Sequence, residues 1–288
     1  MTSSSIRSPL RIAIAQFDPK LGQLQRNMQR IDELLATMPR GSTDLLVLPE
    51  MALTGYVFRT PDSIRPYLEA KGVGATTQYA KDLAERFGCT VVAGYPELPA
   101  SNEVTEGPQV GANAAVICAP NGDVLYHYRK TNMFDTDLPW CIPGTGFGAF
   151  DWNGLRVAIG ICMDLNPDRN AIGWTMEDGP FELADYVIKE NAQVLILLCA
   201  WLDSKDGGPD GRPDPNTVRF WVARLDPLWR PERGDRIFIV ANRCGTEDGE
   251  LFAGSSMVLR YNSKTDELVR VGGLGRTEEA ILRRTVEV

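Results

Sequence analysis

The sequence predicts an α/β fold in which helices cover β-sheets that contain both parallel and antiparallel strand pairs. Short runs rich in Val, Ile and Leu recur along the chain, and helical periodicity separates several of them. Asn121-Gly122 lies between two of these runs and predicts a β-hairpin. We find no repeat and no clear linker, so we expect residues 1–288 to form a single domain whose residues 1–9 are flexible.

The predicted strands are mostly bounded by turn-forming residues. They are Leu10–Ala15, Asp44–Leu48, Thr90–Ala93, Ala114–Cys118, Val124–Tyr128, Arg156–Ile161, Val194–Cys199, Ile237–Ala241, Met257–Arg260 and Glu267–Val271. The glycine-rich stretch Gly144–Gly148 predicts a turn. Asp203–Asn216, rich in Asp, Gly and Pro, predicts a long surface loop, which is often functional.

Two segments carry apolar residues at helical spacing. Leu24–Thr37 has them at positions 24, 28, 31, 34 and 35, and Ala75–Phe87 has them at 75, 79, 80, 83, 84 and 87. Gly88 directly follows the second segment and is a typical helix stop. Phe181–Lys189 and Val218–Leu225 are shorter candidate helices.

The charge balance argues against a nucleic-acid partner. The sequence contains thirty basic and thirty-eight acidic residues, which gives a net charge of −8. No Lys/Arg cluster supplies the basic surface that a nucleic-acid binder needs. The N-terminal Met1–Ile6 lacks the apolar core of a signal peptide, and no apolar run approaches the roughly 20 residues needed to span a bilayer. We therefore expect a cytoplasmic protein with no membrane partner.

The cysteines and the one histidine bear on whether the protein has a zinc site or a catalytic Cys–His pair. Six cysteines are spread without a C-x-x-C pair, which disfavours a zinc site on the usual ligand spacing and predicts reduced thiols. A catalytic Cys–His pair would have to use His127, the sole histidine, but it lies in a strand-like run where packing is the commoner role. If a nucleophile operates here, we expect its base to be another residue type.

A glutamate, a lysine and a cysteine each follow a predicted strand. Taken alone, Glu50 could be a solvated acid, Lys130 an exposed cation and Cys162 an inert packed thiol. Together they can perform nucleophilic catalysis, because Glu50 can take the thiol proton while Lys130 favours the thiolate. The Lys130 ammonium and the backbone N–H of Met163 can then bind the oxyanion of a tetrahedral intermediate.

The segments around these residues resemble the nitrilase, or carbon–nitrogen hydrolase, superfamily. The resembling segments are Leu-Pro-Glu50, Tyr-Arg-Lys130, Gly-Ile-Cys162, Arg11–Gln16, Ala241–Gly245 and Phe252–Ser256. This resemblance covers about residues 10–260. It implies a four-layer α-β-β-α sandwich, a catalytic triad of Glu50, Lys130 and Cys162, and no cofactor or metal.

Two further segments resemble one branch of the superfamily, the fungal protein N-terminal asparagine/glutamine amidases. They are Cys162–Pro167 and Ala200–Leu202 followed after a loop by Thr217–Leu228. This resemblance implies deamidation of an N-terminal Asn or Gln to Asp or Glu through a Cys thioester, with release of ammonia, in the N-degron pathway. The substrate would be the N-terminus of a peptide or protein, and a homodimer is left open.

The sequence departs from the superfamily pattern at one point. Many members carry a second glutamate between the lysine and the cysteine, but residues 131–161 contain none. Asp135 and Asp137 are the acids near that place, and Asp137 is the better candidate to support Lys130. The chain is also shorter at its C-terminus than expected for the N-terminal amidases.

Recognition of an N-terminal residue needs a partner for its α-ammonium, because an unpaired buried charge is costly. Asp164 and Asp203 are the candidate partners, although Asp164 could equally bond backbone amides in its turn. Trp201 could form an apolar wall for the substrate side chain. Together with Asp137, these residues are the candidates for the substrate-binding region.

Two other functions are compatible with the sequence. The nearest alternative is an amidase or carbamoyl hydrolase that acts on a small free metabolite. The alternative from another class is a non-catalytic binding protein on the same fold, against which the intact Glu-Lys-Cys set argues.

Overall fold

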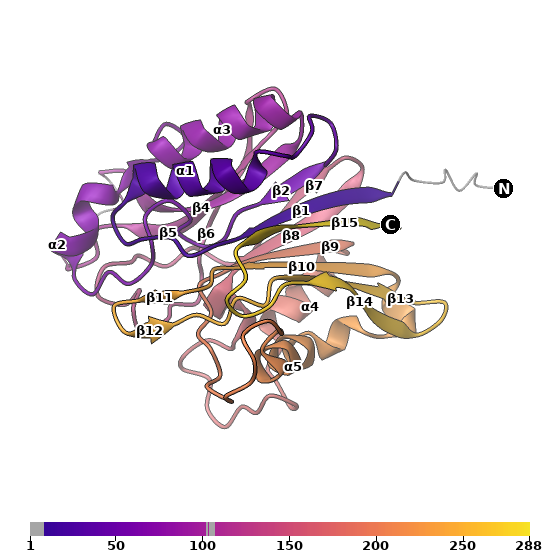
Figure 1. The fold of residues 1–288 in the computed structure, drawn as a ribbon. Coiled ribbons are helices and arrows are strands. Elements are labelled where there is room, and N and C mark those ends of the chain that lie inside the picture. Colours follow the sequence, from indigo (N-terminus) through magenta and orange to yellow (C-terminus); the bar gives the residue numbers. More distant parts are fainter. Residues whose placement is uncertain (1–8, 102, 104–106) are drawn as a thin grey trace.

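The computed structural model describes residues 9–101, 103 and 107–288. Of the residues 1–9 that are expected to be flexible, all but Pro9 lie outside this range. Two β-sheets pack face to face, and helices cover their outer faces (Figure 1). Helices α1 (Leu24–Leu35) and α3 (Ala75–Phe87) lie on one side, and α4 (Glu182–Lys189) and α5 (Pro215–Arg224) lie on the other. This confirms the predicted α-β-β-α sandwich.

The first sheet has seven strands in the order β15-β1-β2-β4-β5-β6, with β3 paired to β4. The pairs β1–β2 and β2–β4 are parallel, whereas β4–β5, β5–β6 and β15–β1 are antiparallel. The bounds are β1 Leu10–Gln16, β2 Leu45–Val47, β3 Glu69–Ala70, β4 Thr90–Leu98, β5 Ala112–Cys118, β6 Val124–Arg129 and β15 Ala280–Val286. The predicted hairpin at Asn121-Gly122 joins β5 to β6.

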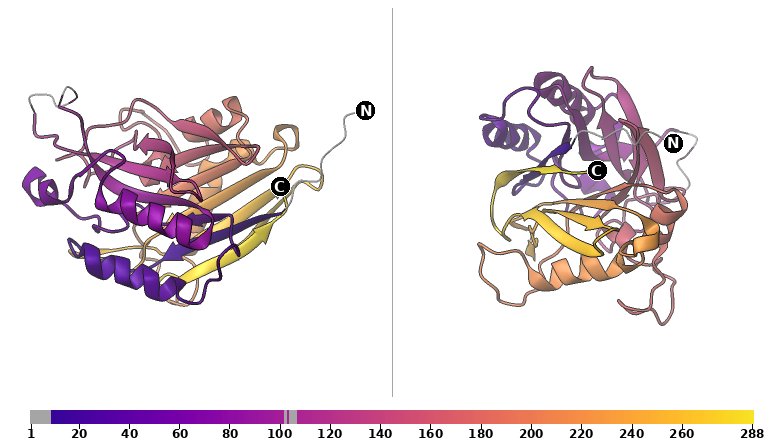
Figure 2. Two further views of the ribbon diagram at one scale, coloured as in Figure 1. Left: turned by 90° about the horizontal axis from the view of Figure 1, so that it is seen from above. Right: turned by 90° about the vertical axis from the view of Figure 1, so that its right-hand side faces the viewer.

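The second sheet has six strands in the order β14-β13-β10-β9-β8-β7. Its central strands β10, β9 and β8 are parallel, and the remaining pairs are antiparallel. The bounds are β7 Gly148–Trp152, β8 Leu155–Ile161, β9 Val194–Cys199, β10 Arg236–Asn242, β13 Met257–Asn262 and β14 Glu267–Gly273. The two views in Figure 2 show the helices outside the paired sheets.

Short elements complete the described chain. They are α2 Pro61–Ile64, the hairpin strands β11 Thr246–Glu247 and β12 Glu250–Leu251, and the 3₁₀ helices η1 Arg65–Tyr67, η2 Cys162–Leu165, η3 Asp226–Leu228 and η4 Pro231–Arg233. In the part of the chain that the structure describes, no helix has the length and apolar character needed to cross a bilayer.

Strand alternation divides the core into two layers. In β1, Ile12 and Ile14 enter the cluster between the sheets, whereas Ala13 and Ala15 enter the cluster beneath α1 and α3. The cluster between the sheets includes Val157 from the second sheet. Each sheet therefore packs one face against the other sheet and one face against its helices. Because both faces are apolar and buried, polar side chains are found at the ends of the strands.

Several elements differ from the sequence-based expectations: α2, β3, β11 and β12 were not predicted, and β4 extends beyond Ala93 to Leu98. Strand β7 begins at Gly148, where the predicted turn ends, and β15 was not predicted. Helix α5 begins at Pro215 rather than at Val218, because the Asp214 side chain accepts hydrogen bonds from the first-turn amides. Asp214 is fully buried, so the loop that begins at Asp203 is anchored at its C-terminal end.

Candidate active site

The three residues expected to form the triad lie at strand ends. Glu50 follows β2 and Lys130 follows β6, both in the first sheet, and Cys162 follows β8 in the second sheet. Glu50 Oε1 and Lys130 Nζ are 2.7 Å apart, and neither side chain is exposed to solvent. The site thus forms where the two sheets meet at one end of their strands.

Glu50 is held by three hydrogen bonds. Its Oε1 accepts bonds from Lys130 and from Asn113 Nδ2 at 2.7 Å each, and its Oε2 accepts one from the backbone N–H of Ala200 at 2.6 Å. Burial raises the pKa of Glu50, and the nearby charge of Lys130 opposes this shift only in part. A carboxylate with a raised pKa is suited to general acid–base chemistry near neutral pH.

Lys130 lies between two carboxylates. Its Nζ donates to Asp137 Oδ2 at 2.7 Å as well as to Glu50, and it lies 5.5 Å from the centre of the Tyr56 ring. Burial disfavours the charged form, but the charges of Asp137 and Glu50 outweigh it and hold the pKa of Lys130 well above its usual value. Cys162 adds to that effect, so its sulfur lies within electrostatic reach of the ammonium.

Asp137 is fixed from several sides. Tyr56 donates its hydroxyl to Asp137 Oδ2 at 3.3 Å, Asn113 Nδ2 donates to Oδ1 at 3.2 Å, and the N–H of Phe134 donates to Oδ2 at 3.0 Å. It is fully buried, whereas Asp135 is exposed. Asp137 therefore contacts Lys130 in the way expected of the better of the two candidate acids.

Cys162 lies at the first position of η2 in the left-handed backbone region, with φ 46°. Such a conformation is uncommon for a non-glycine residue and clusters at functional sites. Its side chain is buried, and only 7% of the residue is exposed. Burial raises the pKa of Cys199, the last residue of β9, and a hydrogen bond to Cys162 raises it further. Cys199 thus lies near Cys162, at the end of the neighbouring strand of the second sheet.

A cavity of about 160 Å³ opens beside Cys162. It is lined by Phe134, Cys162, Met163, Asn166, Ala200, Trp201 and Leu202. The Trp201 ring lies 5.5 Å from that of Phe220 and 5.9 Å from that of Trp221, so its position is fixed by packing. Met163 and Trp201 thus both line the cavity that contains Cys162, and their roles stay predictions.

The two candidate partners for an α-ammonium are engaged elsewhere. Asp164 Oδ1 accepts from the backbone of Thr131 and Asn132, and Oδ2 accepts from Ile161 N–H and the Tyr128 hydroxyl. These bonds match the alternative in which Asp164 holds its turn.

Asp203 is paired with Arg276 at 3.0 Å between Oδ2 and Nε. Its other oxygen, Oδ1, accepts the backbone N–H of Lys205 at 2.7 Å. Neither Asp164 nor Asp203 is among the residues that line the cavity.

Sequence reasoning missed several groups of this site, among them Phe134 and Leu202, which line the cavity. Asn113 bridges Glu50 and Asp137, Tyr56 contacts Asp137, the Ala200 N–H binds Glu50, and Asn166 lines the cavity. A single amide inside the apolar run of β5 was an available signal for Asn113, because buried polar side chains need partners. Tyr56 and the Ala200 N–H contact residues that are distant in the sequence, and no local sequence pattern reveals such contacts.

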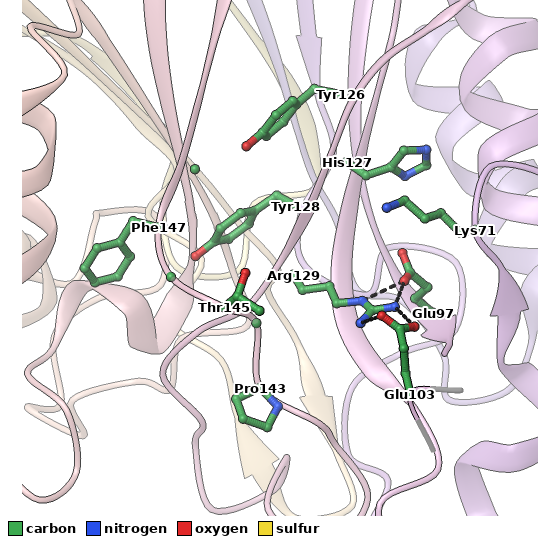
Figure 3. Close-up of a pocket in the computed structure, with 13 residues that line it drawn as sticks. Lys71, Glu97, Glu103, Tyr126, His127, Tyr128, Arg129, Pro143, Thr145 and Phe147 are labelled. Atoms are coloured by element: carbon green, nitrogen blue, oxygen red, sulfur yellow. Dashed lines mark hydrogen bonds and ion pairs between the residues drawn. The ribbon is translucent and has the colours of Figure 1, made fainter. Parts of the chain in front are cut away.

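The single histidine lies in a different pocket, of about 300 Å³ (Figure 3). His127 and Arg129 project from one face of β6, and Arg129 is bound by Glu97 and Glu103. The triad residues do not line this pocket. Within residues 9–101, 103 and 107–288, no group of three or more His, Cys, Asp or Glu side chains is arranged to hold a metal ion.

Comparisons with known proteins identify the family and several relatives of this chain. The family model for carbon–nitrogen hydrolases matches residues 11–178. The protein N-terminal amidase of Schizosaccharomyces pombe is 31% identical over 272 residues, which cover 88% of this chain and 92% of that protein. The protein N-terminal amidase of Saccharomyces cerevisiae is 28% identical over 225 residues, which cover 70% of this chain and 47% of that protein.

A solved structure shares the fold. The crystal structure of an N-terminal amidase with an Asn-Glu-Ala peptide superposes with a TM-score of 0.83 at 21% identity, covering 97% of this chain and 98% of that one. The family match spans more than half of the chain, and the relative from S. pombe is similar over nearly its whole length. The chain belongs to the carbon–nitrogen hydrolase family.

Proposed function

We propose that this protein is an amidase that converts an N-terminal Asn or Gln of a peptide or protein into Asp or Glu, with release of ammonia. The observation that carries the proposal is the buried Glu50–Lys130–Asp137 cluster beside a cavity that contains Cys162. The similarity to two fungal N-terminal amidases supports the substrate class.

In the proposed first half-reaction, the Cys162 thiol gives its proton to Glu50 and the sulfur attacks the carboxamide carbon. The negative charge that develops on the oxygen is stabilised by the Lys130 ammonium and the backbone N–H of Met163. Glu50 then returns its proton to the leaving nitrogen. The C–N bond breaks, ammonia departs, and the acyl group remains on sulfur as a thioester.

In the second half-reaction Glu50 takes a proton from water, and the resulting hydroxide attacks the thioester carbon. The same oxyanion donors stabilise the second tetrahedral intermediate. Collapse breaks the C–S bond, the sulfur recovers the proton from Glu50, and the carboxylic acid product leaves. All groups return to their starting states, so the cycle needs no redox partner.

The cavity sets the size of the substrate. A cavity of about 160 Å³ has room for a short side chain. Its walls include the apolar surfaces of Phe134, Met163, Trp201 and Leu202. We propose that the substrate side chain enters this cavity while the rest of the peptide stays outside, and that the enzyme acts in the cytoplasm on N-degron substrates.

The decisive experiment is mass spectrometry of short peptides that differ in their N-terminal residue. Asn- and Gln-initiated peptides should gain about 1 Da, because OH replaces NH₂, and peptides with other N-terminal residues should not change. Cys162→Ala should abolish the change, whereas Cys89→Ala, a control in the core beneath the helices, should retain it. Turnover by Cys162→Ala would exclude the mechanism.

Two alternatives are tested alongside. If free asparagine or another small amide reacts faster than an Asn-initiated peptide, the enzyme is a metabolite amidase. If Cys162 fails to react with a thiol reagent and no amide is hydrolysed, the chain is a binding protein on a hydrolase fold.

A further inference from the structure

Asn113 is attached to all three charged residues of the buried cluster. Its side-chain Nδ2 lies 2.7 Å from Glu50 Oε1 and 3.2 Å from Asp137 Oδ1. Its backbone carbonyl accepts the N–H of Lys130 at 2.8 Å. Asn113 is fully buried in β5, whose other side chains are apolar, so packing alone does not explain an amide at this position.

The two carboxylates determine which end of the Asn113 amide faces them. An ionised carboxylate accepts hydrogen bonds and donates none, so the NH₂ group has to face Glu50 and Asp137. The other end of the amide, Oδ1, is buried, and among the described residues nothing donates a hydrogen bond to it. An unpaired buried acceptor is costly. The side chain is therefore placed to bind the two carboxylates, even though its own oxygen stays unpaired.

These hydrogen bonds distinguish the two oxygens of Glu50. Each oxygen of a carboxylate can accept about two hydrogen bonds. Oε1 already accepts two, from Asn113 and from Lys130, each at 2.7 Å. In the part of the chain that the structure describes, Oε2 accepts one, from the Ala200 N–H at 2.6 Å. Because Ala200 lines the cavity that contains Cys162, Oε2 lies beside this cavity and can accept one more donor.

We infer that Asn113 is a positioning residue, which occupies Oε1 of Glu50, favours the ionised carboxylate and leaves Oε2 to take the proton of the Cys162 thiol. The inference deepens the proposed reaction and rests on it. In the acylation step the S–H bond breaks, an O–H bond forms at Oε2, and sulfur bonds to the carboxamide carbon. The proton then passes from Oε2 to the leaving nitrogen. A fixed donor at Oε1 keeps the carboxyl group in the orientation that this transfer needs.

The two neighbours Asn113 and Asp137 act on the ionisation of Glu50 in opposite directions. Burial is the main cause of the raised pKa of Glu50, and the negative charge of Asp137 raises this pKa further. The hydrogen bond from Asn113 lowers it, as does the charge of Lys130. The other ionisable groups near Glu50 are Tyr56 and the thiols of Cys141, Cys162 and Cys199.

The sign of the expected pH effect follows from these contacts. Acylation needs Glu50 ionised, so kcat/KM falls as the pH drops through the pKa of Glu50. Loss of the Asn113 donor raises this pKa and should move the acidic limb of the profile to higher pH. Loss of the Asp137 charge lowers it and should move the same limb to lower pH.

The test measures kcat/KM against pH for an Asn-initiated tripeptide. Asn113→Leu removes the donor at similar volume and should move the acidic limb up by about one pH unit, the shift expected from one hydrogen bond to a charged group. Asp137→Asn should move the limb down. Val116→Ala, a truncation of a fully buried side chain in the same strand, is the control. It should lower the thermal unfolding temperature and leave the limb at the wild-type pH.

A second variant keeps the inference testable if Asn113→Leu does not fold. Asn113→Ala removes the same donor with a smaller side chain and should move the limb in the same direction. An acidic limb at the wild-type pH in the folded variant would overturn the inference, even if kcat falls at every pH, because a residue with a merely structural role has that effect.

The outcomes separate this inference from the proposed function. If the Asn-initiated peptide is deamidated and the limb does not move without Asn113, the inference fails while the amidase proposal stands. If the wild type hydrolyses free asparagine or another small amide but no Asn-initiated peptide, the proposed substrate is wrong. The same profiles are then measured with that amide, because the inference concerns the proton transfer and not the substrate.

Discussion

Lys130 owes its charge to the two carboxylates that contact it. In a fully buried position an isolated ammonium would lose its proton, yet Asp137 and Glu50 hold the pKa of Lys130 well above its usual value. The three side chains carry one positive and two negative charges when all are ionised. Proton transfer to Glu50 during catalysis would leave Lys130 paired with Asp137 alone, which suits an oxyanion donor.

Removing the charge of Asp137 tests this arrangement. Asp137→Asn should lower kcat by roughly 10- to 100-fold, because Lys130 loses one of its two carboxylate contacts. Asp137 also raises the pKa of Glu50, so the acidic limb of kcat/KM should move to lower pH in the variant. Asp135→Asn, a change at the exposed neighbouring acid, is the control and should behave as wild type. Equal losses in both variants would contradict the assignment.

Lys130 itself allows a second test at this scale. Loss of one oxyanion donor typically costs roughly 10²–10³ in rate, and Lys130→Ala should lose at least that much. Lys130→Arg should not recover the activity, because the larger planar guanidinium cannot take the place of a compact ammonium that contacts Glu50 and Asp137 in a fully buried position. Single-turnover rates with an Asn-initiated peptide would measure the effect. Near-normal rates in either variant would remove Lys130 from the mechanism.

The sequence predicted the site only where local motifs carry it. Glu50, Lys130 and Cys162 each follow a recognisable strand, and Asp137 could be chosen because few acids lie between Lys130 and Cys162. Asn113 donates hydrogen bonds to Glu50 and Asp137, which are 63 and 24 residues away in the sequence. These bonds depend on the order of the strands in the sheet, which no local motif shows. The sequence could not reveal the hydrogen bonds and the ion pair that Asp164 and Asp203 make, and the role of either acid as partner of the substrate amine stays a prediction.

At the scale of elements, a glycine in β4 determines where Glu50 lies. A Cβ on Gly94 would lie 2.7 Å from the Glu50 Cα and 2.8 Å from the Pro49 carbonyl oxygen, which is too close for any real contact. The Ala52 N–H also donates to the Gly94 carbonyl at 3.1 Å. The turn after β2 therefore crosses directly over this glycine, and the strand and the catalytic turn fit together only without a side chain.

Gly94→Ala should consequently displace Glu50 and reduce kcat by at least about tenfold, since a misplacement of about 1 Å can cost two orders of magnitude. Gly211→Ala is the matched control, because no atom lies within 4 Å of the added Cβ there. Activity and thermal unfolding should be measured together for both variants. Wild-type activity in Gly94→Ala would show that the turn can shift without moving the carboxylate.

Two of the elements that sequence patterns missed are edge strands of the two sheets. β7 and β15 lie at the ends of their sheets, and β15 alternates only weakly, with Arg283, Arg284 and Thr285 exposed. Edge strands face solvent on more sides, so apolar periodicity is weaker there. The central strands of both sheets were predicted because their burial on both faces requires continuous apolar runs. The sequence did not predict which strands pair with one another or their order in each sheet.

At the scale of the whole molecule, the two sheets share one interior. The cluster between them contains Ile12, Ile14 and Val157, and the chain leaves β14 in the second sheet to end in β15 of the first. All seven residues of β1 pair with β15, from Leu10 with Val286 to Gln16 with Ala280. The active site depends on this arrangement, because Glu50 and Lys130 come from one sheet and Cys162 from the other.

We therefore propose that residues 9–288 unfold as one cooperative unit, in keeping with a single domain. Neither sheet can keep its inner face buried when the other unfolds, so urea should produce one transition. The tryptophan fluorescence includes the signal of Trp221 in the second sheet's helical layer, whereas both sheets contribute to the far-UV circular dichroism. If the domain unfolds as one unit, the two signals should give the same midpoint. Leu282→Ala, a change in β15 that opens a cavity between the sheets, should lower that midpoint without splitting the transition and cost about 2–5 kcal/mol. Two separate transitions in either protein would mean that each sheet folds with its own helices and that the active site forms only when the two halves dock.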